Sequence, residues 1–248
     1  MMRSVQRTLA IFECFTSERT SLTLQEIATR IRLPKSTTFR LVQSLDQAGY
    51  LVRLANQAYC LSFRFTRLAG LVKSTLDIRQ VARPAMAELA QKANETVTLN
   101  MVSERHRVCI DVIDTPSPLM SVTKPGERVR LIDGATAKTL MAALPKKELQ
   151  QALTHAAKST GRKRGDLLKE LAHILEQGYA VTHGERVLGL TAISAPIEEA
   201  EGQVRHCVTV TGPTVRLQPR EREIIKLVAR AAADISRRLG AEVSTDAK

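Results

Sequence analysis

A cluster of cationic and hydroxyl side chains follows Pro34, in a stretch whose apolar spacing predicts a helix. Proline suits the first turn of a helix, where its missing N–H leaves no hydrogen bond unmade. Backbone N–H groups at a helix N-terminus carry partial positive charge. With hydroxyl, ammonium and guanidinium donors added, such an end suits phosphate oxygens and base edges in a major groove. The candidate DNA-contacting residues are Lys35, Ser36, Thr37, Thr38 and Arg40, with Arg53 further along as a contact to a flanking phosphate or the minor groove.

A small set of helices and one hairpin must position these side chains. The pattern predicts helices at residues 4–15, 24–31, 35–47 and 62–74, and hairpin strands at 50–53 and 58–61. Thr23 and Glu26 have the spacing of a capping box before the second helix, and Gly49 suits the end of the third. A three-residue turn separates these two helices. This order is typical of a winged helix-turn-helix, which we assign to residues 1–75.

The net charge supports a polyanionic partner. Residues 1–75 carry eleven Lys/Arg against four Asp/Glu, so +7 of the chain's total of +12 lies there. A dense positive field attracts nucleic acid through counterion release, although it could also serve solubility alone. Aromatic residues make up only 3% of the chain, which is a poor supply for stacking single-stranded bases. Duplex phosphate is therefore the favoured partner.

The remaining chain has a different pattern. With 248 residues, the protein exceeds what one compact core usually needs, and we assign a second domain to residues 76–245. Its predicted helices are 77–93, which would link the two domains, and 135–143, 146–157, 166–177 and 219–239; its predicted strands are 97–102, 108–113, 187–197 and 204–211. Helices mixed with antiparallel strand pairs indicate the α+β class.

An ordered set of short segments resembles the isocitrate lyase regulator (IclR) family. In the first domain these are Leu24-Gln25-Glu26-Ile27-Ala28, Leu33 to Leu41 and Gly49-Tyr50-Leu51. In the second they are Glu95-Thr96-Val97, Ile110-Asp111, Pro118-Leu119-Met120, Gly126-Glu127-Arg128, Leu144-Pro145, Gly178-Tyr179-Ala180, Ala195-Pro196-Ile197, Gly212-Pro213 and Leu239-Gly240. The resemblance covers residues 4–240 and depends on the order of the segments rather than on any single one.

This resemblance implies a GAF-like α/β effector domain that binds a small organic acid and modulates the affinity for operator DNA. The family's pocket maps onto Met120, Gly134, Ala135, Thr182, Leu190, Ala192, Thr209 and Thr211. Several positions depart from the common pattern. Thr182 stands where many members have Asp, and we hypothesise that losing this acid favours a more anionic effector.

The residues themselves support such a pocket more weakly. Gly134 and Ala135 open a predicted helix, whose N–H groups could hold a carboxylate or simply begin an ordinary helix. Thr209 and Thr211 share one face of a strand, either lining a pocket or serving as β-branched strand formers.

Enzyme chemistry finds little support in the sequence. The five histidines are scattered without metal-ligand spacing, no P-loop or G-x-S-x-G occurs, and Cys109 near His106 lacks an orienting third group. We therefore expect no catalytic residues, metal or cofactor; the alternative is a metabolic enzyme with a winged-helix interaction module.

The four dispersed cysteines fit a reducing cytoplasm, and no apolar run is long enough to span a membrane. Because palindromic sites are read by symmetric proteins, we expect a homodimer or a dimer of dimers.

Overall fold

The computed structural model describes residues 3–16, 18–75, 77–115 and 123–241. The chain divides into two compact units, Met1–Leu76 and Asp77–Lys248. Each unit has its own buried apolar cluster and is described by itself.

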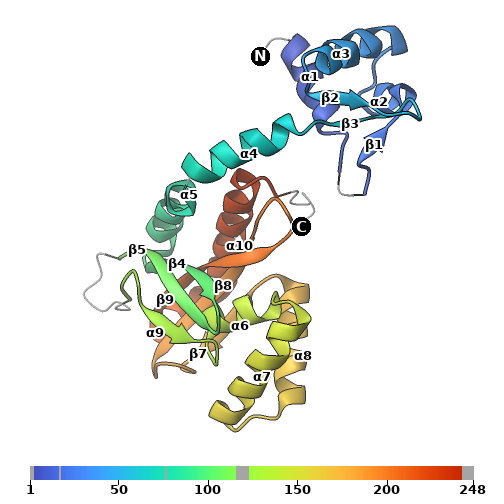
Figure 1. Cartoon of the computed structure of the whole chain (residues 1–248). Coiled ribbons are helices and arrows are strands. Elements are labelled where there is room, and N and C mark those ends of the chain that lie inside the picture. The colour runs from blue at the N-terminus through green and yellow to red at the C-terminus, as the bar shows by residue number, and fades with distance from the viewer. Residues whose placement is uncertain (1–2, 17, 76, 116–122, 242–248) are drawn as a thin grey trace. The chain divides into compact units, whose positions relative to one another are not determined.

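The first unit is a small helical domain with a three-stranded sheet (Figure 1). Its elements are α1 (Arg3–Phe12), β1 (Ser21–Leu22), α2 (Leu24–Arg30), α3 (Lys35–Gln47), β2 (Leu51–Arg53), β3 (Tyr59–Leu61) and α4 (Arg64–Thr75). β2 and β3 form the predicted hairpin, and β1 adds a third antiparallel strand on the far side of β3. The sequence pattern missed β1 because two residues are too few to show an alternation. The apolar sides of α1, α2 and α3 meet the sheet around Ile11, Ile27 and Val42, each with no exposed surface.

Local interactions determine where the helices of this unit begin and end. The Thr23 hydroxyl accepts a hydrogen bond from the Glu26 N–H, while the Glu26 carboxylate accepts one from the Thr23 N–H, so the predicted capping box is confirmed. α3 ends just before Gly49, whose φ of 74° lies in the left-handed region that glycine enters without strain. Both ends of the helix-turn-helix are therefore defined by residues that the sequence pattern identifies.

The second unit is a six-stranded antiparallel sheet between two groups of helices (Figure 1). The strand order is β6-β5-β4-β9-β8-β7. The strands are β4 (Thr96–Ser103), β5 (His106–Ile113), β6 (Arg128–Arg130), β7 (Ala180–His183), β8 (Leu190–Glu198) and β9 (Val204–Pro213). The helices are α5 (Ile78–Ala93), α6 (Ala135–Ala142), α7 (Lys146–Thr160), α8 (Arg164–Gln177), α9 (Thr214–Leu217), the 3-10 turn η1 (Gln218–Arg220) and α10 (Glu221–Arg238).

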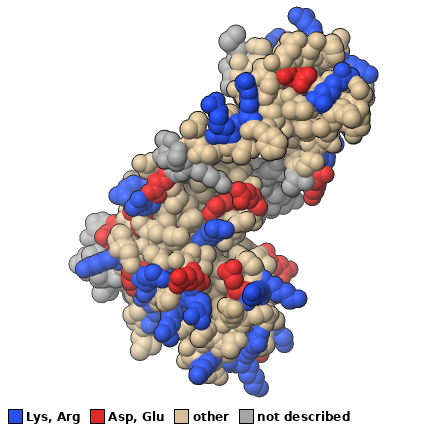
Figure 2. Space-filling model, in the orientation of Figure 1, with Lys and Arg blue, Asp and Glu red and all other residues tan. Residues whose placement is uncertain are grey.

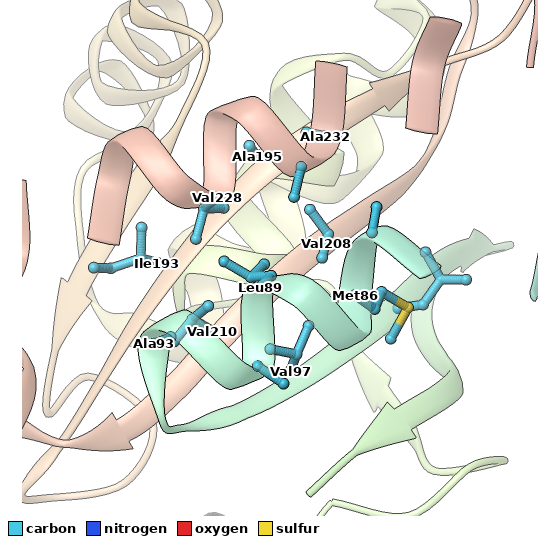
Figure 3. Packing of buried hydrophobic residues seen from close by; sticks show 14 of the residues in the cluster. Met86, Leu89, Ala93, Val97, Ile193, Ala195, Val208, Val210, Val228 and Ala232 are labelled. Atoms are coloured by element: carbon cyan, nitrogen blue, oxygen red, sulfur yellow. The ribbon is translucent and has the colours of Figure 1, made fainter. Parts of the chain in front are cut away.

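Side-chain alternation along the strands gives the sheet two different faces. On one face, the apolar side chains of β4, β8 and β9 pack against α5 and α10, as Figure 3 shows for Val97, Ile193 and Val208. On the other face, the intervening side chains are mostly polar and lie toward α6; Thr98, Ser194 and Thr209 belong to this set. α6 in turn packs with α7 and α8 in a second apolar cluster. The sheet therefore presents a polar face beneath α6, where a pocket can form.

The predicted α+β class, with a winged helix-turn-helix followed by a GAF-like α/β domain, is confirmed in outline. The helix predicted at residues 77–93 appears as α5, which packs in the core of the second unit and begins after Asp77; the Asp77 carboxylate accepts a hydrogen bond from the Arg79 N–H. Two strands of the second unit, β6 and β7, were missing from the sequence prediction because each is short and lies at an edge of the sheet.

Candidate functional site

The first candidate surface is the outer side of α3. The side chains of Lys35, Ser36 and Arg40 are exposed, and that of Thr37 is half-buried. Because positions three and four apart share one face of a helix, Ser36 and Arg40 lie on the same side. This surface combines two cations and two hydroxyls at the N-terminal half of the helix.

Thr38 does not belong to this surface, which corrects the sequence prediction. Its side chain has no exposed area, and its hydroxyl donates to the Pro34 carbonyl oxygen at 3.2 Å. About one hundred degrees of rotation per residue carries position 38 to the side that faces Val42 and Leu45. The cluster of five polar residues therefore divides, with Thr38 in the core and the other four outside.

Sequence reasoning also missed two residues of this surface. Phe39 is 43% exposed and Gln43 lies one helical turn further along, and both share the face of Ser36 and Arg40. The candidate residues were chosen for cationic and hydroxyl groups, so Phe39 is not among them. Its exposure next to Arg40 adds a ring that can contact a thymine methyl group or the edge of a sugar.

Arg53 lies at the end of β2, in the hairpin that forms the wing. Its side chain is exposed, and its guanidinium carbon stands 6.0 Å from the centre of the Tyr59 ring. In Figure 2 the visible face of the first unit shows several basic side chains and few acidic ones, whereas both signs occur on the second unit.

The second candidate site is a cavity of about 330 Å³ on the polar face of the second unit's sheet. This volume is at the lower end of the range for small-molecule pockets. The lining comes from β4, β5, β7, β8 and β9, from the beginning of α6 and from the segment between β7 and β8. The lining residues are Thr98, Arg107, Thr123, Asp133, Gly134, Ala135, Thr136, Thr182, Glu185, Arg186, Val187, Leu190, Ala192 and Thr211.

Six of the eight predicted pocket residues line this cavity, namely Gly134, Ala135, Thr182, Leu190, Ala192 and Thr211. Met120 lies outside the described residues. Thr209 lies beneath the cavity instead, because it is 1% exposed and its hydroxyl bonds to those of Ser194 and Thr136 at 2.9 and 3.1 Å. Its hydroxyl is thus already used to hold α6 on the sheet.

The N-terminus of α6 is not the open carboxylate cradle that the sequence suggested. The Ala135 N–H donates to the Thr182 hydroxyl at 3.0 Å, and the Gly134 N–H donates to the Glu185 carboxylate at 3.1 Å. A carboxylate does stand at this helix end, but it belongs to the protein. Glu185 also supplies the negative charge at this end of the pocket that the absence of an Asp at position 182 had seemed to remove.

Most charged groups around the cavity are paired with each other. Lys138, only 3% exposed, forms ion pairs with both Glu170 and Glu185. At the rim, Arg186 pairs with Glu127 at 2.9 Å. Burial, followed by the nearby Glu185 carboxylate, raises the pKa of Asp133 above its ordinary value.

Arg107 is the exception among the cations near the cavity. It lies on β5 and is only 5% exposed, and one guanidinium nitrogen donates to the Asn100 side-chain oxygen at 3.0 Å. Asn100, fully buried, donates in turn to the Thr98 hydroxyl at 2.9 Å. In the part of the chain that the structure describes, Arg107 has no ion pair with an acidic residue. Sequence reasoning missed it because the predicted strand begins at residue 108, which leaves Arg107 outside every predicted element.

The family model described as "IclR helix-turn-helix domain" matches residues 4–55, and the model described as "Bacterial transcriptional regulator IclR C-terminal" matches residues 71–237. The chain belongs to the IclR family. The exposed edge of α3 therefore lies in an IclR helix-turn-helix DNA-binding domain, and the cavity lies in the C-terminal domain of an IclR transcriptional regulator.

Individual IclR relatives match over nearly their whole length. The HTH-type transcriptional regulator KipR of Bacillus subtilis is 31% identical over 244 residues, covering 96% of this chain and 97% of KipR. A solved IclR transcriptional regulator from Silicibacter sp. TM1040 has a TM-score of 0.90 at 20% identity, with 98% of both chains covered. An IclR homologue from Microbacterium hydrocarbonoxydans, solved in complex with 4-hydroxybenzoate, has a TM-score of 0.58 at 21% identity, with 95% of this chain and 98% of that one covered.

The thiols of the effector-type domain are unsuited to nucleophilic chemistry. Burial raises the pKa of Cys109 and of Cys207 to about 11, so both thiols are protonated at neutral pH. Among the residues described, no group of three or more His, Cys, Asp or Glu side chains is arranged to hold a metal ion. None of the described helices is long and apolar enough to cross a membrane.

Proposed function

We propose that this IclR-family regulator binds a specific duplex operator through α3 and the β2–β3 wing. The observation that carries the proposal is the exposed edge formed by Lys35, Ser36 and Arg40 at the N-terminal half of α3. A helix of this kind fits the major groove, where its first turns meet base edges. In this proposal Arg53, which is exposed at the end of β2, contacts a flanking phosphate or the minor groove. Because a symmetric site needs two such helices, the acting species is a homodimer or a dimer of dimers in the cytoplasm.

A gel-shift titration with operator DNA tests the DNA contacts. The DNA upstream of the gene itself and of its neighbours is the first source of sites to screen. Lys35→Ala with Arg40→Ala should weaken binding and, if both contact phosphates, lower the slope of log K against log salt by about 2. The matched control removes two exposed cations from α7, Lys146→Ala with Lys147→Ala, and should leave both quantities unchanged. Equal loss in the two double variants would show that only overall charge matters.

We further propose that the second domain binds a small organic acid that changes the operator affinity. The cavity of about 330 Å³, with cationic and hydroxyl groups in its wall, supports this proposal. The complex of an IclR homologue with 4-hydroxybenzoate supports an organic acid as the class of ligand. Binding shifts the populations of arrangements that place two winged helices differently relative to a palindromic site.

Thermal-shift screening of mono- and dicarboxylates, followed by gel shifts with each stabilising acid, tests this second proposal. An acid that binds the pocket should raise the melting temperature and also move the midpoint of the DNA titration. The acid should be recovered unchanged after prolonged incubation, because the protein acts as a regulator and not as an enzyme. Turnover of the acid would contradict this, and stabilisation without any change in DNA affinity would show a regulator that has lost its response.

A further inference from the structure

The two ends of the cavity differ in whether their cationic side chains are paired with carboxylates. At the α6 end, Lys138 pairs with two glutamates, and Arg186 pairs with Glu127, so both cations are already neutralised. At the β5 end, Arg107 is buried to nearly the same degree as Lys138, but among the residues described its hydrogen bond goes to the neutral side-chain oxygen of Asn100. Asp133 is close enough to interact with it electrostatically but forms no ion pair with it. An amide oxygen satisfies one N–H without neutralising the positive charge.

A buried guanidinium without an anion is costly, because the charge has left water and gained no opposite charge in exchange. Buried arginines are therefore usually paired, and one that lines a cavity points to an anionic ligand. Arg107 is also pre-oriented. The Thr98 hydroxyl accepts a hydrogen bond from the Asn100 amide, which directs the Asn100 oxygen at Arg107 and holds the guanidinium against the floor of the cavity.

We propose that Arg107 binds the carboxylate of the effector, and that the effector is a small acid with a single carboxylate and an apolar body. This inference rests on the proposed effector-binding function of the same pocket. It places the carboxylate at the β5 end of the cavity, and not at the N-terminus of α6, where Glu185 already accepts the Gly134 N–H.

The sheet order indicates where the rest of the effector lies. β5 and β8 are three strand positions apart, about 14 Å from backbone to backbone at the usual spacing. Between them, the wall consists of the small side chains Thr98 and Thr211 on β4 and β9. On the β8 side, Val187, Leu190 and Ala192 form an apolar wall. An acid bound at Arg107 therefore extends across the sheet and ends against these apolar side chains.

A second carboxylate is disfavoured at the far end of the cavity. Glu185 and Asp133 both line the cavity near the beginning of α6. A ligand carboxylate directed toward them would meet like charge, with Lys138 already occupied by two glutamates. Because of this like-charge repulsion, the pocket should bind a monocarboxylate more tightly than a dicarboxylate of the same length.

The experiment compares matched ligands by calorimetry and thermal shift on the full chain. The probes are benzoate with its neutral analogue benzamide, and hexanoate with hexanamide and adipate. We expect wild type to bind the two monocarboxylates and to bind the amides at least about tenfold more weakly, the loss that one missing charge-assisted pair produces. Adipate should also bind at least about tenfold more weakly than hexanoate, because its second carboxylate meets like charge. Arg107→Gln should lose this preference and bind the monocarboxylates about 10- to 100-fold more weakly.

The matched control is Arg186→Gln, which removes the same charge from the wall of the same cavity but from a residue already paired with Glu127. It should keep the preference for carboxylate over amide. Folding of Arg107→Gln is checked by its ligand-free melting temperature, which should not fall, because an unneutralised buried charge has been removed. Arg107→Lys, which keeps the positive charge but loses the planar guanidinium, should bind the monocarboxylates with an affinity between those of wild type and Arg107→Gln.

The outcomes separate the two proposals. If Arg107→Gln binds the monocarboxylates as wild type does, or if adipate binds as tightly as hexanoate, the assignment of Arg107 and of a single carboxylate is wrong while the effector pocket stands. If wild type responds to no carboxylate in the wider screen, the effector function itself is wrong, and this inference falls with it.

Discussion

The close approach of Gly212 to the Glu95 side chain gives a direct test of the packing in the second unit. It lies near the end of β9, and a β-carbon placed on it would stand 2.5 Å from the carboxylate carbon of Glu95, well inside van der Waals contact. Glu95 is 2% exposed and accepts two hydrogen bonds from the Arg216 guanidinium, at 2.5 and 2.8 Å. We predict that Gly212→Ala pushes the Glu95 carboxylate out of this position and breaks a largely buried ion pair.

The size of the effect follows from the exposure of the two partners. Removing one member of a buried ion pair costs about 3–5 kcal/mol. Because the Arg216 side chain is 33% exposed, water replaces part of what is lost, and we take about 2–4 kcal/mol. Alanine recovers about 0.4–1 kcal/mol by restricting the unfolded chain. The net destabilisation is about 1–3.5 kcal/mol, which lowers the melting temperature of a domain of this size by about 2–14 °C.

Urea denaturation and thermal melts of the full chain measure this loss. Gly165→Ala is the control, because Gly165 lies in α8 and a β-carbon added there would meet nothing within 4 Å, so alanine should be neutral or slightly stabilising. The decisive comparison is Gly212→Ala in a Glu95→Ala background. Without the carboxylate there is nothing to displace, so the second substitution should cost little. An equal cost in both backgrounds would refute the explanation through Glu95.

Three further predictions concern the pocket and its surroundings. Thr182→Val should reduce the free energy of unfolding by about 1 kcal/mol, because the N–H at the beginning of α6 loses its acceptor; an unchanged urea midpoint would contradict this role. Lys138→Met should cost about 2–4 kcal/mol, because Glu185 loses its cation and Glu170 keeps only its ion pair with Arg162. Although burial raises the pKa of Glu170, hydrogen bonds from Lys138 and then an arginine hold it below its ordinary 4.5, so its contribution is present above about pH 4.5 and is lost as the pH falls through the lowered value. The difference in urea midpoint between wild type and Lys138→Met should therefore shrink as the pH falls below about 4.5. Finally, iodoacetamide near neutral pH should label the partly exposed Cys60 well before Cys207, whose pKa of about 11 keeps it protonated; mass spectrometry of the native protein measures the order.

The winged helix-turn-helix could be predicted almost entirely from sequence because its determinants are local. The capping box at Thr23, the glycine at position 49 and the apolar spacing of α3 each act within a few residues. The wrong assignment of Thr38 to the exposed surface also concerns a position that is determined locally, by the helical period. A polar residue was grouped with its neighbours by type, although helical geometry places it among Val42 and Leu45.

The effector pocket could be predicted only in part, because its walls come from strands and loops far apart in sequence. Family resemblance located Thr182 and Thr211, but it did not show that Glu185 occupies the α6 N-terminus. That contact joins residues 51 positions apart. Arg107 was missed for a similar reason: its burial depends on residues of other strands, such as Asn100 on β4, and the sequence does not show that these strands are neighbours.

The pairing of β4 with β9 has a consequence for how the protein is made. Thr98 and Thr209 are register partners, although more than 100 residues separate them, so the central pair of the sheet joins the beginning and the end of the second unit. On the ribosome, the winged helix-turn-helix can fold while the second unit is still incomplete, because its apolar core is built from residues between Ile11 and Tyr59. The apolar sides of β4 and α5 must wait for β8, β9 and α10 to emerge. We therefore expect a stage in synthesis at which the first unit is folded while the second unit is unfinished and prone to aggregate. A premature stop before β9 would leave a chain with a folded winged helix-turn-helix and without a folded second unit.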